Sequence, residues 1–315
     1  MKKFLLILLF ITPIISCNKN NFNQKDVKEE HTSFKTNAEK ILFHLRNPKK
    51  DYVLIVAHRG DWTYAPENSL EAIKRCIEMG IDIAEIDVQK TKDGQMVLMH
   101  DYNVDRTTNG TGNVSDFTLK EIRELRLKNN CGIQGSRQQV PTLEEVMLLA
   151  KDKIVINLDK TEGETLKEAY EILKKTGTVH QAIFKGNDSI QFMRNKYGTL
   201  LDSIIYMPKV WNNIPNLHNY IDDFNHDLKP IAYEMLFDNV ESPVFSAIKT
   251  MNAKKITVLN IALWDNLVAG HTDEQALLES PDAAWGRLIE NGANAIMTDR
   301  PAEPLKYLRS KGLHD

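Results

Sequence analysis

Short apolar runs recur along most of the chain, separated by helical patterns, and this alternation restricts the fold more than any other feature of the sequence. The first run, 51–57, reads DYVLIVA and is apolar almost throughout. A continuous apolar run of this length is typical of a strand buried on both faces of a parallel sheet. Eight more strand-like runs follow it, at 81–88, 96–99, 153–158, 181–184, 203–207, 230–235, 255–261 and 294–297.

Amphipathic patterns with a helical period lie between most of these runs. The clear ones are at 142–150, 164–176, 188–197 and 285–291, and a short helix is predicted at 37–45. Strands that alternate with helices over roughly 260 residues predict a (β/α)8 TIM barrel, with a doubly wound parallel sheet as the alternative. Nine runs exceed the eight places in a barrel. Only a tight turn at Asp93-Gly94 joins 81–88 to 96–99, so one run is expected to form a hairpin excursion or an extra strand.

Charged and polar residues follow several predicted strands at their C-terminal ends. In a barrel these ends share one face, and that face carries the chemistry. We therefore expect these side chains to converge. They are His58, Arg59, Glu85, Asp87, His100, Asp101, Asp159, Lys160, Lys185, Glu234 and Asp299.

Glu85 and Asp87 are two residues apart within an apolar strand, so their side chains should point to the same face. Burying carboxylates without a counter-charge is costly, so a positive group must lie nearby. That group is either a lysine or arginine or a metal ion. Asp159, at the end of another apolar strand, offers a third carboxylate. Three oxygen ligands favour a hard divalent cation, Mg²⁺ or Ca²⁺, over zinc.

His58 and His100 each follow a strand and are each followed by a charged residue. A pair of imidazoles near a metal site suits proton transfer to and from a phosphate ester, although a single histidine in such a place is more often structural or a metal ligand. Arg59, Lys160 and Lys185 are predicted to bind the phosphate. The inventory indicates metal-assisted chemistry on a phosphodiester.

Glu67, Asn68 and Asp101 are assigned a supporting role. Glu67 would support a histidine or the metal site, and Asn68 could instead cap the helix that follows it. Arg106 is expected to brace the loop after Asp101. Aromatic residues near the later strand ends could form a wall for the alcohol part of a substrate, or simply pack in the core. They are Tyr206, Trp211, Tyr233, Phe237 and Trp264.

The first seventeen residues have the proportions of a signal peptide, with two lysines ahead of an apolar run at 4–15. The run ends before Cys17 in a pattern similar to a bacterial lipobox. This predicts lipidation of Cys17 and export, with the protein anchored to the cell envelope in the periplasm or outer membrane. An ordinary signal peptide with a chance cysteine is the alternative. Residues 18–38 read as a polar tether, and 39–315 as the folded domain.

Composition narrows the partners further. The net charge of −3 gives no global basic field, so nucleic acid is not an expected partner. Besides Cys17, only Cys76 and Cys131 remain, too few for a disulfide framework. Because the net charge is negative, anion binding must depend on a local site for a small molecule.

Together these motifs resemble the glycerophosphodiester phosphodiesterase family. The resemblance runs from about residue 52 to 308 and is densest between 58 and 112. It is carried by His58-Arg59-Gly60, Pro66-Glu67-Asn68-Ser69, Glu85-Ile86-Asp87-Val88, Thr91-Lys92-Asp93-Gly94, His100-Asp101, Arg106-Thr107-Thr108 and the late run Gly292-Ala293-Asn294-Ala295-Ile296-Met297-Thr298-Asp299-Arg300-Pro301. It implies a TIM barrel of the phospholipase-C-like phosphodiesterase type that uses a divalent cation to hydrolyse glycerophosphodiesters to sn-glycerol 3-phosphate and an alcohol.

The resemblance also implies roles for single residues. Glu85 and Asp87 would bind the metal, His58 and His100 would act as the acid/base pair, and Arg59 would contact the phosphate. Asp159 stands where the family usually has a glutamate, which leaves metal choice and substrate open. Two alternatives stay open as well: a related barrel phosphodiesterase with phosphoinositide or lysolipid specificity, and a catalytically inactive binding protein anchored at the cell surface.

Overall fold

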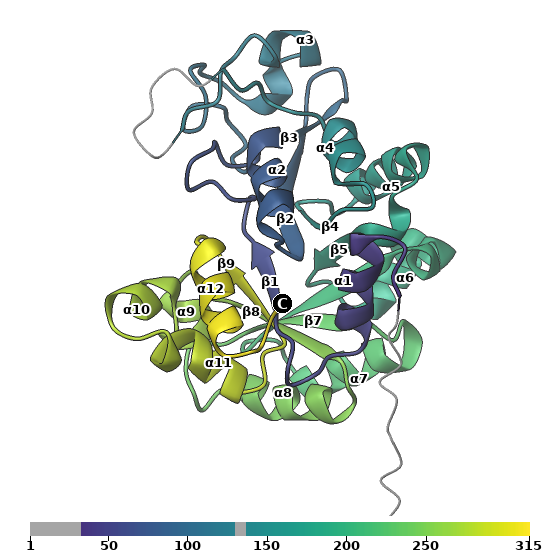
Figure 1. Ribbon diagram of the computed structural model, residues 1–315. Helices are drawn as coiled ribbons and strands as arrows, with labels where there is room; N and C mark the ends of the chain where they lie inside the picture. The colour runs from purple at the N-terminus through teal and green to yellow at the C-terminus, as the bar shows by residue number, and fades with distance from the viewer. Residues whose placement is uncertain (1–32, 130–136) are drawn as a thin grey trace, which may run out of the picture. The chain divides into compact units, whose positions relative to one another are not determined.

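Eight parallel strands close into a barrel, which confirms the predicted (β/α)8 architecture (Figure 1). The structure is a computed structural model, and it describes residues 33–129 and 137–315. Residues 1–17, most of the predicted tether at 18–38, and Cys131 lie outside the described residues. The compact unit spans Phe34–Asp315 and so begins ahead of the predicted boundary at residue 39. None of its described helices is long and apolar enough to cross a membrane.

The strands follow one another around the barrel in the order β1-β9-β8-β7-β6-β5-β4-β2, and a pairing between β1 and β2 closes the ring. β3 (Met96–Leu98) pairs antiparallel with β2 outside the ring, which confirms the predicted hairpin excursion. The barrel strands are β1 (Leu54–Ala57), β2 (Ile83–Lys90), β4 (Val155–Asp159), β5 (Ala182–Gly186), β6 (Ile205–Trp211), β7 (Ala232–Leu236), β8 (Thr257–Ile261) and β9 (Ala295–Thr298).

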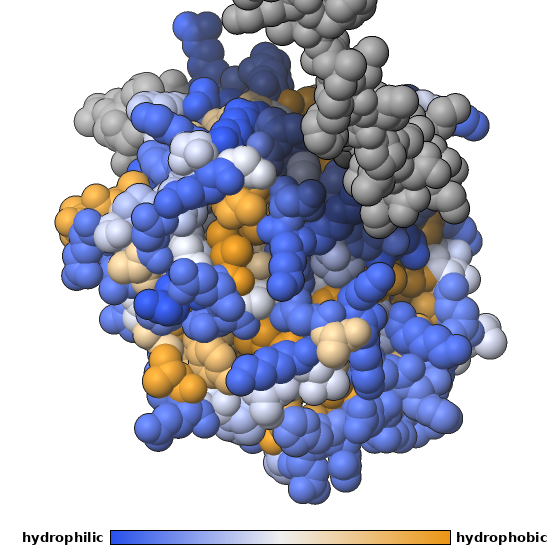
Figure 2. Space-filling view, turned by 60° about the horizontal axis from the view of Figure 1, so that its bottom comes forward, coloured by the Kyte–Doolittle hydropathy of each residue, from blue (hydrophilic) through white to orange (hydrophobic). Residues whose placement is uncertain are grey.

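Helices connect the strands and cover the outside of the barrel. The α-helices are α1 (Asn37–Arg46), α2 (Leu70–Met79), α3 (Leu119–Ile122), α4 (Leu143–Ala150), α5 (Glu164–Thr176), α6 (Ile190–Tyr197), α7 (Leu217–Asp227), α8 (Pro243–Ala253), α9 (Asp265–Val268), α10 (Asp273–Leu278), α11 (Arg287–Glu290) and α12 (Ala302–Ser310). The face turned forward in Figure 2 is mostly hydrophilic, with hydrophobic side chains in scattered patches.

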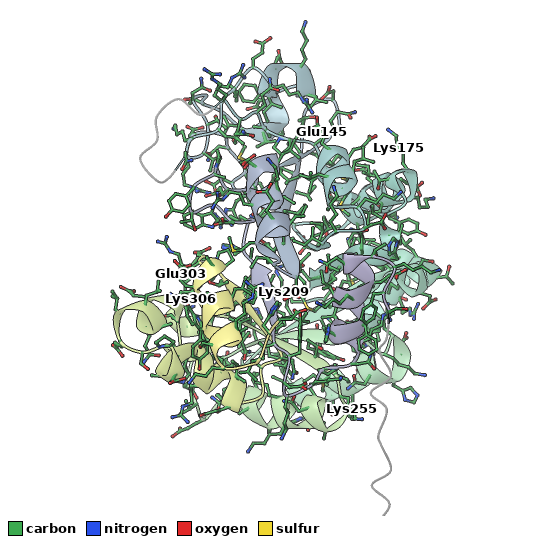
Figure 3. The ribbon with its side chains drawn as sticks, in the orientation of Figure 1. Glu145, Lys175, Lys209, Lys255, Glu303 and Lys306 are labelled. Atoms are coloured by element: carbon green, nitrogen blue, oxygen red, sulfur yellow. The ribbon has the colours of Figure 1, made fainter. Side chains whose placement is uncertain are left out.

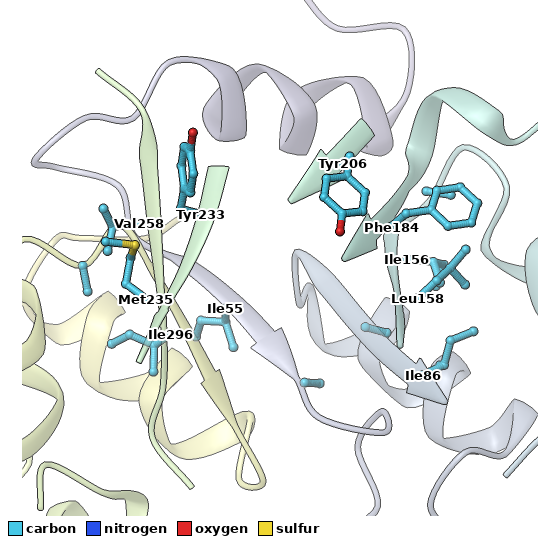
Figure 4. Close-up of a cluster of buried hydrophobic side chains, with 14 of the residues drawn as sticks. Ile55, Ile86, Ile156, Leu158, Phe184, Tyr206, Tyr233, Met235, Val258 and Ile296 are labelled. Carbon is cyan, nitrogen blue, oxygen red and sulfur yellow. The ribbon is translucent and has the colours of Figure 1, made fainter. Parts of the chain in front are cut away.

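The strands bury both faces, as their continuous apolar runs predict. Their outward side chains pack against the helices in the main hydrophobic core, and Figure 4 shows Ile55, Ile86, Leu158 and Phe184 among them. Their inward side chains form a second cluster inside the barrel, in which Leu54 and Val155 lie at the first residues of β1 and β4. Toward the C-terminal ends, charged side chains line the ring at Asp87, Asp159, Lys185 and Lys209, whereas β7 and β8 still end in the apolar Leu236 and Ile261.

The helix α1 covers the N-terminal end of the barrel. Ile41, Leu42 and Leu45 pack into the inner cluster. The carbonyl oxygen of Leu45 accepts a hydrogen bond from the Thr257 hydroxyl at the first residue of β8. This end is therefore filled, and any site inside the ring must open at the C-terminal ends of the strands.

The excursion that begins with β3 has a small core of its own, built from Val97, Met99, Val104, Val114, Ile122, Leu127 and Val140. These side chains are buried, so the excursion is a packed unit attached to the barrel rather than an extended loop. It carries His100 and Asp101. The position of these two residues therefore depends on local packing as well as on the barrel.

Candidate active site

A cavity of about 560 Å³ opens at the C-terminal ends of the barrel strands. It collects most of the residues predicted for the site. The charged and polar residues that line it are His58, Arg59, Glu85, Asp87, His100, Asp159, Lys185, Asn187, Lys209, Glu234 and Asn266. An apolar side of the same cavity includes Trp211, Leu236, Leu263 and Trp264.

Glu85, Asp87 and Asp159 each offer a carboxylate oxygen, and these oxygens lie within 4.8 Å of one another. The strand register explains the meeting, because Asp87 pairs with Asp159 across β2 and β4 and Glu85 pairs with Asn157 one layer below. The longer glutamate side chain reaches up to the level of the two aspartates. The Oδ1 atom of Asn157 is also buried, with no hydrogen-bond partner among the described residues. A set of clustered oxygen donors fits a hard divalent cation.

Lys185 from β5 is fully buried beside this carboxylate cluster. Its Nζ atom lies 2.9 Å from Asp159, 3.4 Å from Glu234 and 3.6 Å from Glu85. Burial lowers the pKa of Lys185, but the three carboxylates outweigh burial and hold this pKa well above its ordinary value. For Asp159, burial raises the pKa, while Lys185 and Lys209 outweigh it and keep the pKa low. Lys185 therefore stays charged and neutralises part of the cluster.

His58 is held by a carboxylate from the far end of the chain. Its Nδ1 atom lies 2.7 Å from Oδ1 of Asp299, just after β9, and the indole nitrogen of Trp62 donates to the same oxygen over 3.2 Å. Burial lowers the pKa of His58, but the Asp299 hydrogen bond and the charges of Glu85 and Asp299 raise it above its ordinary value. With Nδ1 engaged, Nε2 is the ring nitrogen left for proton transfer.

His100 has a matching carboxylate partner on the excursion. Its Nδ1 atom lies 2.6 Å from Oδ1 of Asp101. Arg106 donates to both oxygens of Asp101 and also to both oxygens of Glu67, at 2.7 and 2.8 Å, so it braces this loop as expected. The hydrogen bond from Arg106, together with His100, lowers the pKa of Asp101 far below its ordinary value. Asp101 is therefore ionised wherever the protein is folded near neutral pH.

Glu67 and Asn68 tie the loop after β1 to its neighbours, Glu67 to Arg106 of the excursion and Asn68 to Asp87 of β2. Glu67 accepts a hydrogen bond from the Arg59 guanidinium at 2.9 Å. The Asn68 side chain donates to Asp87 Oδ2 at 2.9 Å and accepts from the backbone N–H of Asp87 at 3.1 Å. Asn68 is thus engaged with Asp87, while Ser69 caps α2. Both residues lie where a supporting role would place them.

Sequence reasoning missed Lys209, although it lines the cavity. The predicted strand stopped at residue 207, whereas β6 continues to Trp211 through Pro208, a residue that usually ends a strand. Lys209 then points into the ring two positions beyond the inward Met207, and Figure 3 labels it near the centre of the barrel, in contrast to Lys175 at the periphery.

Lys160 is placed differently from its prediction. It has a left-handed backbone φ of 58° directly after β4, and its Nζ atom lies over the Tyr102 ring, 5.5 Å from the centroid. Lys160 is not among the residues that line the cavity.

Asp273 is a second residue that the sequence did not reveal. Its Oδ2 atom accepts hydrogen bonds from the Asp299 backbone at 2.9 Å and from the Thr298 hydroxyl at 2.8 Å, and its Oδ1 atom accepts one from Trp285. Burial raises the pKa of Asp273 to about 6 in spite of these hydrogen bonds. Asp273 fixes the backbone from which Asp299 reaches His58.

Of the five aromatic residues considered for the substrate wall, two line the cavity. Trp264 is 53% exposed, and its ring stands edge-on to His58 with centroids 6.1 Å apart. Trp211 lies at the end of β6. The other three, Tyr206, Tyr233 and Phe237, are buried in the outer core.

Fold and site together define a TIM-barrel protein with clustered carboxylates and two histidines at its C-terminal mouth. The model of the glycerophosphoryl diester phosphodiesterase family matches residues 58–303, so the chain belongs to this family.

Named relatives agree with this membership. A glycerophosphodiester phosphodiesterase of Caldanaerobacter subterraneus subsp. tengcongensis is 47% identical over 114 residues, which are 36% of this chain and 47% of the relative. A putative glycerophosphodiester phosphodiesterase of Bacillus subtilis is 47% identical over 100 residues, 32% of this chain and 41% of the relative. The matched part is thus less than half of these relatives' length. The human lysophospholipase D GDPD1 is 23% identical over 299 residues, covering 89% of this chain and 93% of the relative.

Solved structures share the fold. The crystal structure of a glycerophosphoryl diester phosphodiesterase from Parabacteroides distasonis has a TM-score of 0.70 at 23% identity, covering 88% of this chain and 93% of the other. An Oleispira antarctica phosphodiesterase, solved in complex with the product sn-glycerol-3-phosphate, has a TM-score of 0.63 at 23% identity and covers 82% of this chain and 96% of the other.

Proposed function

We propose that this chain hydrolyses glycerophosphodiesters to sn-glycerol 3-phosphate and an alcohol. The observation that carries the proposal is the meeting of two carboxylate-held histidines with the three-carboxylate cluster in one cavity. Named relatives and the product complex of the Oleispira antarctica enzyme point to the same reaction. An acidic cluster, two proton carriers and cavity cations are the groups that phosphodiester cleavage needs.

In the proposed mechanism, Glu85, Asp87 and Asp159 would hold Mg²⁺ or Ca²⁺, and the bound ion would supply positive charge against the phosphate. Of His58 and His100, one takes a proton from the attacking hydroxyl or water and the other gives a proton to the leaving oxygen. Asp299 and Asp101 keep Nδ1 of each imidazole occupied, so that Nε2 carries out the transfer.

Cations and supporting residues complete this proposed site. Arg59 stays beside the carboxylates through its hydrogen bond to Glu67 and binds the phosphate. Lys185 lies among three buried carboxylates and supplies part of their counter-charge.

The test is release of sn-glycerol 3-phosphate from glycerophosphocholine by the full chain, with EDTA, Mg²⁺ or Ca²⁺. We expect metal-dependent product that falls by about 100-fold or more in His58→Ala and His100→Ala. His226→Ala, which changes an exposed histidine on α7, is the matched control. A folded protein that releases no product with either metal would refute the proposal and favour the inactive binding protein.

A lysolipid is a second candidate substrate, favoured by the apolar side of the cavity at Leu236, Leu263 and Trp264. The match to human lysophospholipase D GDPD1 over most of the chain supports it. The same assay with lysophosphatidylcholine separates the two, because free choline with lysophosphatidic acid would appear in place of sn-glycerol 3-phosphate. A kcat/KM ratio in favour of glycerophosphocholine would exclude the lysolipid as the preferred substrate.

We also propose that Cys17 is lipidated and that the protein is exported and anchored to the bacterial cell envelope. The support is the apolar run at 4–15 followed by the lipobox-like pattern. Labelling with a radioactive fatty acid should mark the wild-type chain and leave Cys17→Ala unmarked. Recovery of the wild-type protein in the cytosol would refute this proposal.

A further inference from the structure

We propose that Lys209 on β6 binds the phosphate group, and that it shares Asp159 with the metal site, so that phosphate binding and metal binding are coupled. The inference rests on the proposed function, since it takes the substrate to be a phosphodiester. No motif of the sequence singled out Lys209.

Lys185 is not free to bind an anion. Its Nζ atom lies within 3.6 Å of three carboxylates, and its side chain is only 2% exposed. The ammonium group is surrounded by these carboxylates, and its nearest contact is the Asp159 oxygen at 2.9 Å. Moving Lys185 toward a phosphate would leave buried carboxylates without a counter-charge, which is costly.

Arg59 is free only in part. One terminal nitrogen donates to Glu67 at 2.9 Å, Nε lies 3.5 Å from Asp87, and the backbone N–H donates to Glu85. These contacts fix the guanidinium at the rim of the carboxylate cluster. Arg59 therefore lines the cavity as a cation of fixed position.

Lys209 is held much more loosely. Its Nζ atom lies 3.3 Å from each oxygen of Asp159, both long for charged hydrogen bonds, and the structure gives it no other carboxylate partner among the described residues. Its side chain is 21% exposed, in contrast to the enclosed Lys185. At least one of its three donors therefore faces the cavity, where a phosphate oxygen would lie.

Asp159 links the two sites. Its oxygens already accept hydrogen bonds from the Lys160 backbone at 2.7 Å, from Lys185 at 2.9 Å and from Lys209. A divalent cation that binds Asp159 competes with Lys209 for the same oxygens and weakens its hold. The released ammonium can then turn to the phosphate. Coupling of this kind is reciprocal, so phosphate that draws Lys209 away improves Asp159 as a metal ligand.

This arrangement predicts opposite effects for one substitution. Lys209→Met removes the phosphate contact and also removes a competitor for Asp159. We therefore expect weaker binding of sn-glycerol 3-phosphate, by about 10- to 100-fold, together with tighter binding of Mn²⁺ used as a probe for Mg²⁺. Lys209→Arg should retain most of the phosphate affinity. A residue with only a structural role would weaken both ligands together.

Both affinities would be measured by calorimetry on the full chain, with Mn²⁺ alone and with sn-glycerol 3-phosphate at saturating Mn²⁺. Lys306→Met is the matched control, since Lys306 is an exposed lysine on α12 outside the cavity and should change neither affinity. Parallel loss of both affinities in Lys209→Met, or unchanged binding of sn-glycerol 3-phosphate, would overturn the proposal.

A further calorimetric titration with inorganic phosphate in place of sn-glycerol 3-phosphate separates the role of Lys209 from the proposed function. If wild type binds phosphate but not sn-glycerol 3-phosphate, the proposed substrate is wrong, and a loss of phosphate binding in Lys209→Met still supports the role of Lys209. If wild type binds neither anion, both proposals fail.

Discussion

The imidazole Nδ1 of His58 lies 2.7 Å from the carboxylate of Asp299, a residue 241 positions further along the chain. This contact depends on closure of the barrel. β1 pairs with β9 in a register that sets Ala57 beside Thr298, so the residues that follow them, His58 and Asp299, lie side by side. The backbone N–H of His58 also donates to the Thr298 carbonyl at 3.0 Å. The last strand therefore completes a site that begins with the first.

Asp299→Ala should lower kcat by about 100-fold or more, because His58 loses the partner that fixes its tautomer and orientation. KM should change much less, since Asp299 is not proposed to contact the substrate. Steady-state kinetics with glycerophosphocholine measure both constants. Asp51→Ala, which removes an exposed carboxylate ahead of β1, is the control. Full activity in Asp299→Ala would show that His58 needs no positioning partner.

Lys185→Met should destabilise the protein by about 3–5 kcal/mol, because it leaves three carboxylates buried without their shared counter-charge. Urea unfolding measures the change. Mg²⁺ or Ca²⁺ should restore part of the loss if either ion binds this cluster. Lys175→Met is the control, since its pair with Glu144 is at the surface and should cost at most about 1 kcal/mol. A Lys185→Met variant as stable as wild type would contradict the assigned role.

Gly60 lies in the turn after β1, and Gly94, in the turn between β2 and β3, serves as its matched comparison. Both have left-handed φ values, 77° and 76°, but a Cβ atom on Gly60 would lie 2.9 Å from Cβ of Ala72, whereas one on Gly94 would meet nothing within 4 Å. Gly94→Ala should cost about 1–2 kcal/mol for backbone strain alone. Gly60→Ala should cost more and reduce activity, since it displaces the turn that carries Arg59. Equal losses of stability would rule out the steric explanation.

His314 should make stability depend on pH at the N-terminal end of the barrel. It is buried, and its Nε2 atom lies 3.0 Å from Asp82. Burial lowers the pKa of His314, but the hydrogen bond and charge of Asp82 outweigh it and raise the pKa above 6.5. Because the folded state holds this proton more tightly, its stabilisation is complete below about pH 6.5 and is lost as pH rises through the raised pKa.

The measurement is the melting temperature of wild type and His314→Gln across this range. The melting temperature of wild type should exceed that of His314→Gln by the largest margin at pH 6, and this difference in melting temperature should decrease as pH rises above 6.5. Taking the difference between the two proteins cancels the other titrating groups, including His44 and His58. A gap that stays constant or widens with pH would contradict the assigned pKa direction.

The sequence predicted the barrel because strand and helix periods are local properties that tertiary contacts do not alter. The meeting of Asp87 with Asp159 was also predictable, since both lie near the C-terminal ends of the predicted strands 81–88 and 153–158, and these ends share one face. The Asp299 contact to His58 was not, because it depends on which strands become neighbours when the ring closes. Lys160 and Lys209 were not placed by the sequence, for two local reasons. Lys160 has a left-handed backbone φ directly after β4, which a strand pattern does not predict. Lys209 follows Pro208, and the proline hid the continuation of β6 to Trp211.

The two ends of the barrel unit meet on the side away from the cavity. Lys40 of α1 forms an ion pair with Asp315, and the Tyr52 hydroxyl donates to Asp315 at 3.1 Å. A bead attached at Lys40 or Asp315 would therefore lie on the side opposite the mouth of the barrel and leave the cavity open to the surrounding solution. Small diffusing substrates would reach an immobilised form of this protein as easily as a free one.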